Sequence, residues 1–436
     1  MIKKRLKRIL GRDEHRELLD KLAAEHNTID NLWAYLKTAI DEGRSSSLAQ
    51  KEYVSNEIIA LKAQTNKKRL LITGYYGARN CGDELMLRAI LDNIDFKKFD
   101  VTILCADNYY IDLSIYSPCN VIHYPRRPDD ILYISKYFDV VLWGGGAVID
   151  DTRYRYYHDE ENDLTYIAAK ITISMLKMGK TAYILGVSTN KDLKDPNLIR
   201  DLNYIVKNAR LFALRDTNSF KTLQNSGINT KTVKIVDDLA LALTYDKKSR
   251  KTGEAFTIGV VFIMNDENIE YLSKFVITLS KSFDVKVRIK CIPFFDKNGY
   301  DSFYFERINE LTKKANVAMS IADNDFTPEG VADAFSSCDL IISMRYHATL
   351  IASFVMGINT VSINYSSVHK HYYNKTEYIK QQYSKSLSDI DYLEILNRNK
   401  LSKAIRQASL PSKASTSSKS LASIRKEIES LIKDIK

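Results

Sequence analysis

Residues 339–350 read DLIISMRYHATL, a short apolar run followed by a segment with helical spacing. The run is typical of a buried strand, so the stretch predicts a strand-to-helix turn of a parallel α/β sheet. Arg345 and His347 fall in that turn. A guanidinium binds phosphate or carboxylate through paired hydrogen bonds, and imidazole titrates near neutral pH. An isolated histidine here would more often be a buried structural residue, but the pair favours an anion site that can move a proton.

Similar apolar runs recur along the chain with helical segments between them, which indicates crossover connections and parallel sheets. The runs form two groups, separated by the polar segment 244–254, which we interpret as a domain boundary. The first group is 70–73, 101–104, 140–143, 182–185 and 211–214, and the second is 256–262, 285–291, 340–343 and 360–363.

These groups predict two Rossmann-like, doubly wound parallel-sheet domains whose strand ends face a shared cleft. The expected organisation has four parts. They are a helical N-terminal extension (1–67), a first domain (68–246), a second domain with the donor site (254–370), and C-terminal helices (371–436) interrupted by the serine-rich spacer 409–420.

The composition limits the classes of partner and compartment. The five cysteines form no C-x-x-C pair, which favours reduced thiols in a cytoplasmic protein and argues against a structural zinc site. The net charge of +10 favours an anionic partner but does not choose among nucleic acid, membrane lipid and a phosphorylated substrate. No basic-aromatic nucleic-acid motif is present, so a scaffold or nucleic-acid binder is the weakest interpretation.

The first ten residues carry five basic and no acidic side chains. Their spacing fits a cationic amphipathic helix on anionic lipid, and equally a solvated chain end. Because no apolar signal region or membrane-spanning stretch follows, we expect a cytoplasmic protein, at most associated with the inner face of the membrane.

Residues 73–85 (TGYYGARNCGDEL) predict a glycine-containing turn that opens a helix running to about Leu91, with Asp83 as its cap. The spacing fits neither the dinucleotide-binding fingerprint nor a P-loop, so no nucleotide cofactor is indicated. A plain turn is the alternative to a ligand-lining loop. The candidate loop residues are Gly74, Tyr75, Gly77, Asn80 and Asp83.

A second turn holds three consecutive glycines, Gly144, Gly145 and Gly146. Such a run is costly to order and is usually tolerated where another group approaches the backbone closely, which favours a ligand-lining loop over a bare turn. Asp151 follows as a candidate for polarising a sugar hydroxyl, although an aspartate pair at this place is more often a helix cap.

Arg215 directly follows the predicted strand 211–214. Two interpretations remain open on the sequence: a surface salt bridge with Asp216, or a cationic side chain facing the cleft.

Segments 74–84, 144–146 and 343–348, in this order, resemble the polysaccharide pyruvyltransferase family, and 214–216, 236–239 and 292–294 extend the likeness from about Leu70 to Lys370. The resemblance implies a two-domain fold of the GT-B type and transfer of the enolpyruvyl group of phosphoenolpyruvate onto two hydroxyls of a sugar. The product would be a pyruvate ketal with release of phosphate. The acceptor would be a cell-surface polysaccharide or its lipid-linked precursor.

By the same resemblance, Arg345 and His347 match the family's Arg-x-His, and Arg215 matches its donor-binding arginine. Tyr346 could add its backbone N–H to the donor site. His347 as imidazolium could protonate the vinyl carbon or the departing phosphate. No cofactor or metal is implied, since phosphoenolpyruvate is a co-substrate.

The alternative is a GT-B-type glycosyltransferase that uses a nucleotide sugar. Against it, no Asp or Glu lies between Arg345 and Lys370, where a ribose-binding acid would be expected.

Overall fold

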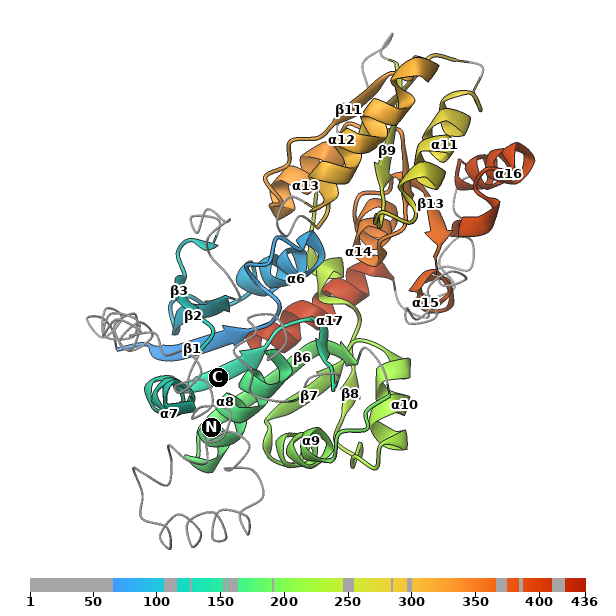
Figure 1. Cartoon of the computed structure of the whole chain (residues 1–436). Coiled ribbons are helices and arrows are strands. Elements are labelled where there is room, and N and C mark those ends of the chain that lie inside the picture. Colours follow the sequence, from blue (N-terminus) through green and yellow to red (C-terminus); the bar gives the residue numbers. More distant parts are fainter. Residues whose placement is uncertain are drawn as a thin grey trace, which may run out of the picture.

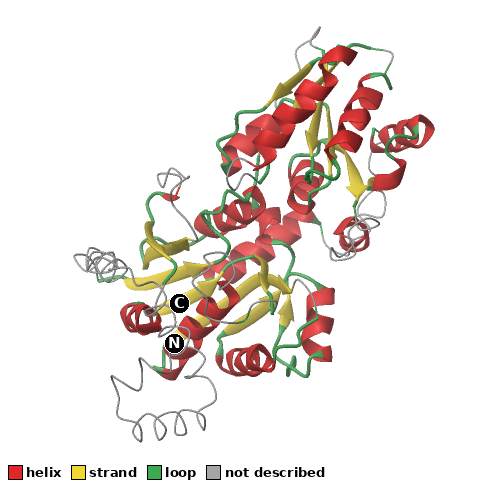
Figure 2. Cartoon of the chain, in the orientation of Figure 1, coloured by secondary structure: helices red, strands yellow, loops and turns green. Residues whose placement is uncertain are grey.

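The structure is a computed structural model. It describes residues 66–105, 116–125, 128–151, 154, 164–189, 192–245, 255–283, 285–295, 300–365, 375–383, 387–409 and 420–436. Figure 1 and Figure 2 show two α/β units joined by a narrower region in which helices from both units meet. We call residues 66–245 the N-terminal unit and residues 255–409 the C-terminal unit.

The N-terminal unit is built on a parallel sheet with the strand order β3-β2-β1-β4-β6-β7-β8, and β5 pairs with β6. Its strands are β1 (Lys68–Thr73), β2 (Phe99–Cys105), β3 (Asn120–His123), β4 (Val140–Trp143), β5 (Gly146–Ile149), β6 (Thr181–Thr189), β7 (Leu211–Leu214) and β8 (Lys234–Ile235). Its helices are α6 (Cys81–Leu91), α7 (Pro128–Tyr137), α8 (Leu164–Lys177), α9 (Pro196–Asn208), α10 (Thr217–Asn225) and the 3-10 turn η2 (Leu239–Ala242).

The C-terminal unit has a second parallel sheet, ordered β11-β10-β9-β12-β13-β14. Its strands are β9 (Phe256–Val261), β10 (Val287–Cys291), β11 (Met319–Ile321), β12 (Leu340–Ser343), β13 (Asn359–Asn364) and β14 (Ser388–Asp391). Its helices are α11 (Ile269–Ser280), α12 (Tyr300–Thr312), η4 (Lys313–Ala315), α13 (Pro328–Ser336), α14 (Tyr346–Leu350), the π-helix η5 (Ile351–Val355), α15 (Lys375–Gln382), η6 (Tyr392–Glu394) and α16 (Arg398–Ala408).

Two parallel sheets with helical crossovers confirm the predicted fold class. In both units the strands alternate with helices, because each short apolar run is followed by a segment with helical spacing. Most of the predicted boundary segment 244–254, and the N-terminal extension up to residue 65, lie outside the described residues. The exact domain boundaries therefore stay predictions.

The segment 371–436 differs from the helical interpretation in two ways. First, Ser388–Asp391 forms β14, which pairs in parallel with β13 and extends the second sheet. This strand is polar and short, and the segments on both sides have helical spacing, so the sequence pattern predicts helix here instead of a strand. Second, the last helix, α17 (Leu421–Lys433), packs against η2 in the N-terminal unit rather than on the unit that precedes it. Figure 1 shows α17 crossing beside β6.

The apolar face of α17 explains why this helix packs on the N-terminal unit. Its buried residues are Ile424, Ile428 and Ile432, and Ile435 follows the helix. Leu431, which the helical spacing of Ile424, Ile428 and Ile435 would place on the same face, is only partly buried. In addition, Nε of Arg425 donates to the carbonyl of Leu241 at 3.2 Å. Burial of several isoleucines, each contributing about 1.5–3 kcal/mol, holds the chain end across the first unit.

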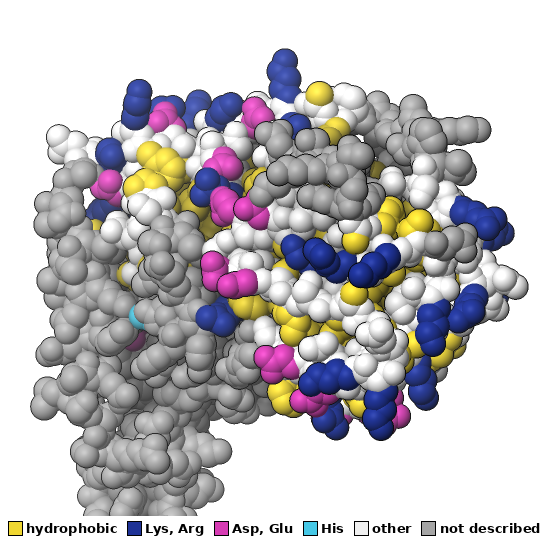
Figure 3. Space-filling view, turned by 90° about the horizontal axis from the view of Figure 1, so that it is seen from above, with side chains coloured by type: hydrophobic (Ala, Val, Ile, Leu, Met, Phe, Trp, Pro, Cys, Tyr) yellow, Lys and Arg dark blue, Asp and Glu magenta, His cyan; other side chains and the backbone are white. Residues whose placement is uncertain are grey.

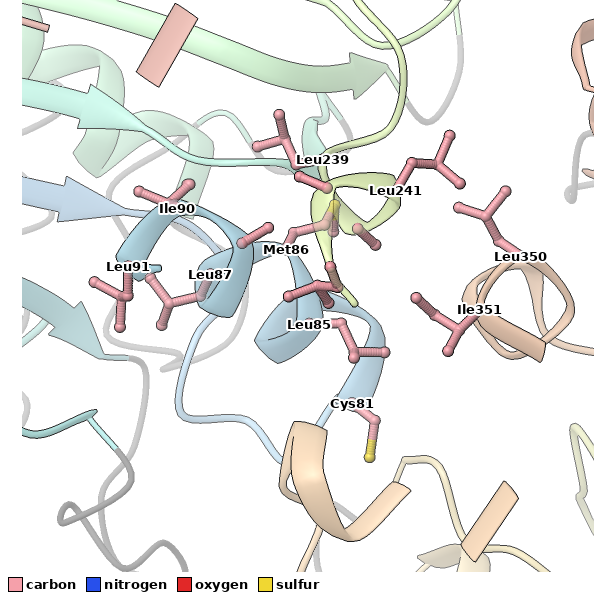
Figure 4. Close-up of a cluster of buried hydrophobic side chains, with 14 of the residues drawn as sticks. Cys81, Leu85, Met86, Leu87, Ile90, Leu91, Leu239, Leu241, Leu350 and Ile351 are labelled. Atoms are coloured by element: carbon pink, nitrogen blue, oxygen red, sulfur yellow. The ribbon is translucent and has the colours of Figure 1, made fainter. Parts of the chain in front are cut away.

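Helix α6 lies at the junction of the two units. Its apolar side chains, among them Leu85 and Met86, share one buried cluster with Leu239 of η2 and with Leu350 and Ile351 of the C-terminal unit (Figure 4). The backbone also crosses the junction, because the N–H of Cys81 donates to the carbonyl of Phe294 at 3.0 Å. The first turn of α6 is therefore held against the C-terminal unit.

Within the part of the chain that the structure describes, no helix is both long and apolar enough to cross a membrane. The basic residues 1–10 are not among the described ones. On the face shown in Figure 3, the described Lys and Arg side chains are spread among acidic and apolar ones instead of forming one patch.

Candidate active site at the domain junction

Arg215 is buried at the end of β7 and pairs with a carboxylate from a distant part of the chain. Its Nη1 lies 3.1 Å from Oδ2 of Asp238, which has no exposed surface. Burial lowers the pKa of Arg215, but the adjacent Asp238 carboxylate more than offsets this and raises it. A surface salt bridge with Asp216, the alternative interpretation, does not form, because Arg215 is buried and its ion pair is with Asp238, while Asp216 caps α10 and accepts the N–H of Ser219 at 2.5 Å.

His347 completes this cluster from the C-terminal unit. Its Nε2 lies 3.3 Å from Oδ2 of Asp238 and 3.3 Å from Nη1 of Arg215. Burial alone would raise the pKa of Asp238, but the positive charge on His347 and Arg215 lowers it to about 2. Asp238 is therefore ionised at neutral pH. At Nε2 of His347 this carboxylate favours a proton, whereas the Arg215 guanidinium at the same distance opposes one.

Space for the imidazole is provided by Gly82 in the first turn of α6. A Cβ on this residue would lie 2.2 Å from Nδ1 of His347. The glycine therefore lets helix α6 and the ring approach more closely than any other residue would allow.

Arg345 belongs to a second buried ion pair, formed within the C-terminal unit. Its Nη2 donates to both oxygens of Asp301 at 2.7 and 2.9 Å, and its Nε donates to the carbonyl of Phe262 at 3.0 Å. The backbone N–H groups of Phe294 and Phe295 also donate to Asp301. Burial raises the pKa of Asp301, and Arg345 lowers it only in part.

The hydrogen bonds of Arg345 engage two of the three guanidinium nitrogens. With Nε and Nη2 engaged, Nη1 has no hydrogen-bond partner among the described residues. The side chain is 18% exposed, so an oxygen acceptor can reach it.

Tyr346 links the two ion pairs. It opens α14 directly after Arg345, whose backbone is extended with φ −104° and ψ 134°. Its ring packs under the guanidinium of Arg215, 5.2 Å from ring centre to Cζ. Its backbone N–H, the predicted donor contact, lies in this first helical turn.

The turn before α6 has a different cap from the predicted one. The side chain of Asn80 accepts the N–H of Gly82 at 3.2 Å, so Asn80 is the cap and Asp83 is not. Asp83 lies inside the helix and is buried. The predicted end of this helix at Leu91 is confirmed.

A buried carboxyl, Glu84, organises the rest of that turn. It accepts the N–H of Gly77 at 2.9 Å and the hydroxyl of Tyr116 at 2.7 Å. Burial raises its pKa from 4.5 to about 7, although both hydrogen bonds lower it. Tyr75 is half-buried and packs against the core of the first unit.

The glycines of both turns are closely approached by the protein's own side chains. Tyr76 fills the space beside Gly74 and Gly144, Met86 lies against Gly145, and Asp83 lies against Gly146. The close approach to the backbone that the sequence predicts at Gly144, Gly145 and Gly146 is therefore made at least in part by the protein's own packed side chains.

Asp151 accepts the backbone N–H groups of Lys194 and Asp195 and so ties two loops together. Its carboxylate serves the turn before α9, whose cap is Asp195. Among the described residues, no group of three or more His, Cys, Asp or Glu side chains is placed to hold a metal ion.

The structure thus brings Arg215, Tyr346 and His347 together, and it adds two residues that the sequence analysis missed as site residues. Asp238 was visible only as part of the segment 236–239. Asp301 had no recognisable signal, because its partner Arg345 lies 44 positions away.

Two parallel sheets that meet at an Arg–Asp–His cluster form a two-domain α/β fold of the GT-B type. The chain matches the family described as polysaccharide pyruvyl transferase over residues 80–367 and belongs to that family. It is therefore a transferase enzyme of polysaccharide biosynthesis.

Solved structures agree on the fold. The UDP-GlcNAc 2-epimerase of Methanocaldococcus jannaschii superposes with a TM-score of 0.51 at 12% identity, covering 84% of this chain and 99% of that one. The HepE protein of Anabaena, solved with UDP and glucose, gives a TM-score of 0.50 at 10% identity, covering 84% of this chain and 95% of that one. At these identities the likeness concerns the fold alone. No curated protein matches the sequence.

Proposed function

We propose that this enzyme transfers the enolpyruvyl group of phosphoenolpyruvate onto two hydroxyls of one sugar, forming a pyruvate ketal and releasing phosphate. The acceptor is a cell-surface polysaccharide or its lipid-linked precursor. The proposal extends to a cytoplasmic location, with residues 1–10 resting on the anionic inner face of the membrane.

The donor carries a phosphate and a carboxylate, and the site offers a guanidinium for each. The Nη1 of Arg345 is available for one anionic group, since Asp301 and Phe262 hold the rest of that side chain. Arg215 is the second cation and contacts His347 directly. Bidentate or paired contacts from two fixed guanidinium groups would orient the enol carbon for attack.

Ketal formation requires two proton movements. When the first hydroxyl adds to C2 of the donor, C3 gains one proton and becomes a methyl group, while the hydroxyl loses one. When the second hydroxyl displaces the phosphate, its proton leaves with that phosphate. One acid–base group that gives up a proton and takes one back can serve both steps.

His347 is the proposed acid–base group. The observation that carries this proposal is the contact of its Nε2 with a buried, ionised Asp238. The carboxylate favours a proton on the nearby Nε2 and fixes the ring's orientation.

The glycine turns and Asp151 remain proposals for the acceptor side. Residues Gly74, Tyr75, Gly77, Asn80, Asp83, Gly144, Gly145, Gly146 and Asp151 lie at or just beyond the carboxyl ends of β1, β4 and β5, where parallel sheets usually bind ligands.

The test is to incubate the purified protein with phosphoenolpyruvate and candidate acceptor sugars and to follow phosphate release. Turnover is expected with the enol phosphate and no nucleotide sugar. Turnover only with a nucleotide sugar would support the glycosyltransferase alternative instead.

The acid assignment is tested separately with His347→Ala. We expect loss of turnover by about 10²–10⁴-fold, while phosphoenolpyruvate still binds in a calorimetric titration because Arg345 is retained. An unchanged rate would remove His347 from the chemistry.

A further inference from the structure

Helix α15 of the C-terminal unit reaches across the junction to the main chain of the Arg215–Asp238 pair. The hydroxyl of Tyr378 donates to the carbonyl of Arg215 at 2.8 Å. The N–H of Asp238 donates to the hydroxyl of Tyr383 at 3.2 Å, directly after the helix ends. The side-chain amide of Gln382 donates to Oδ1 of Asp237 at 3.0 Å.

The bond of Tyr383 is buried, the other two are partly buried, and packed rings support both tyrosines. Tyr383 is 3% exposed, and its ring packs against Phe354 and Tyr378 with centroids 5.7 and 6.5 Å away. Tyr378 also packs against Tyr346, the ring beneath the Arg215 guanidinium, at 6.0 Å. The phenols are therefore held in place before they bond to the N-terminal unit.

Both anchored residues belong to the ion pair that His347 must meet. A buried ion pair depends steeply on geometry, because small displacements lose attraction without restoring hydration. The imidazole comes from α14 and the anchors come from α15, and these two helices pack against each other. The same part of the C-terminal unit thus supplies the acid–base group and fixes its partners.

We propose that Tyr378, Gln382 and Tyr383 are positioning residues for the transfer reaction. They hold the backbone of Arg215 and Asp238 so that the cluster with His347 is complete only while the two units are docked through α15. The inference rests on the proposed function of that cluster.

The kinetic test uses Tyr378→Phe and Tyr383→Phe, which remove one hydroxyl each and keep the ring packing. The matched control is Tyr271→Phe, because the Tyr271 hydroxyl makes the same kind of bond, to the carbonyl of Tyr392 at 3.0 Å, wholly within the C-terminal unit. Phosphate release from phosphoenolpyruvate and thermal unfolding are measured for all three variants.

Each junction variant is expected to lower kcat by about three- to tenfold, the effect of one lost hydrogen bond, and the double variant by roughly 30-fold. KM for phosphoenolpyruvate should rise by a smaller factor, because Asp301 holds Arg345 independently. The control should keep the wild-type kcat at a similar unfolding temperature. Wild-type kcat in the double variant, or an equal loss in the control, would overturn the inference.

An activity-independent measurement separates this inference from the proposed function. Hydrogen exchange of the segment 236–243 should speed up in Tyr383→Phe and stay unchanged in Tyr271→Phe. If wild-type protein fails to use phosphoenolpyruvate but exchange responds as expected, the proposed function fails and the docking role stands. If exchange in that segment is unchanged, the docking role fails whatever the enzyme's substrate.

Discussion

The two arginine–aspartate pairs at the junction differ in which parts of the chain build them. Arg345 finds Asp301 and the carbonyl of Phe262 within its own unit. Arg215 finds Asp238 in its own unit, but the contact with His347 comes from the other one. The first pair therefore forms within one unit, whereas the contact of the second pair with His347 depends on how the two units are docked.

The buried carboxyls in this region show how cationic partners offset burial. Asp238 contacts two cationic side chains, and its pKa falls to about 2 despite complete burial. Asp301 has one, and its pKa stays above the ordinary value. Glu84 has only hydrogen-bond donors among the described residues, and its pKa rises to about 7. The three groups form a graded series in which each added positive charge favours ionisation.

The largest effect is expected from Asp238→Asn. The amide leaves Arg215 buried without a counter-charge, which typically costs about 3–5 kcal/mol of stability. It also removes the carboxylate beside His347, so turnover should fall by about 10²–10⁴-fold. Thermal unfolding and phosphate release measure the two effects.

Asp216→Asn is the matched control for that variant. Asp216 is adjacent to Arg215 in sequence, but its carboxylate accepts the N–H and the hydroxyl of Ser219 at the start of α10, and asparagine caps helices nearly as well. Its charge acts on Arg215 less strongly than that of Asp238. If both variants lost the same stability and activity, the Arg215–Asp238 pair would not be the important contact.

The Arg345–Asp301 pair is tested by Arg345→Lys. A point charge can still face Asp301, so the fold should keep its unfolding temperature. The lysine ammonium cannot bond to both Phe262 and Asp301 and also present a further N–H to the donor. We therefore expect kcat/KM for phosphoenolpyruvate to fall by on the order of 10²-fold. Arg288→Lys, at an exposed position of β10, is the control. Wild-type kinetics in Arg345→Lys would exclude Arg345 from the donor site.

Glu84→Gln tests the carboxyl that lacks a cation. Because the folded-state pKa of Glu84 lies above its ordinary value, the folded protein binds more protons than the unfolded chain between pH 4.5 and about 7. The stability contributed by this group is present at acidic pH and is lost as the pH rises through 7. One pKa unit corresponds to about 1.4 kcal/mol, so the change is on the order of 3 kcal/mol at most.

Glutamine keeps an acceptor for Gly77 and Tyr116 but cannot ionise. The variant should therefore lose less stability than wild type when the pH is raised from 5 to 8, as measured by thermal unfolding at both values. Glu270→Gln, exposed on α11, controls for loss of a surface carboxyl. Parallel pH curves for Glu84→Gln and wild type would contradict the assignment.

The positions of the cations could be predicted from the sequence because each follows a strand. Arg215 comes directly after an apolar run, and Arg345 and His347 open the next helix, so local spacing alone places them at the sheet ends. Their partners could not be predicted, because Asp238 and Asp301 reach them only through tertiary packing. The same holds for α17, whose apolar stripe indicates burial but not the unit that it covers.

The cap of α6 shows a limit of another kind. Asn80, Asp83 and Glu84 are all polar residues near one helix start, and composition does not decide among them. The backbone decides: Asn80 is extended, with φ −99° and ψ 98°, so its side chain reaches the free N–H of Gly82. Asp83 is already helical and cannot.

The smallest effect in this series is expected from Gly82→Ala, which has opposing consequences for helix α6 and for the site. Alanine favours a helix over glycine by about 0.5–1 kcal/mol, so α6 itself should gain stability. The new methyl group, however, would meet the imidazole of His347. The ring must move away from Asp238, or the two units must separate slightly. We expect about a tenfold loss in kcat and a smaller loss of stability than in Asp238→Asn, because the gain in α6 offsets part of the cost of the clash. Wild-type kcat would show that contact between α6 and His347 does not constrain the acid–base group.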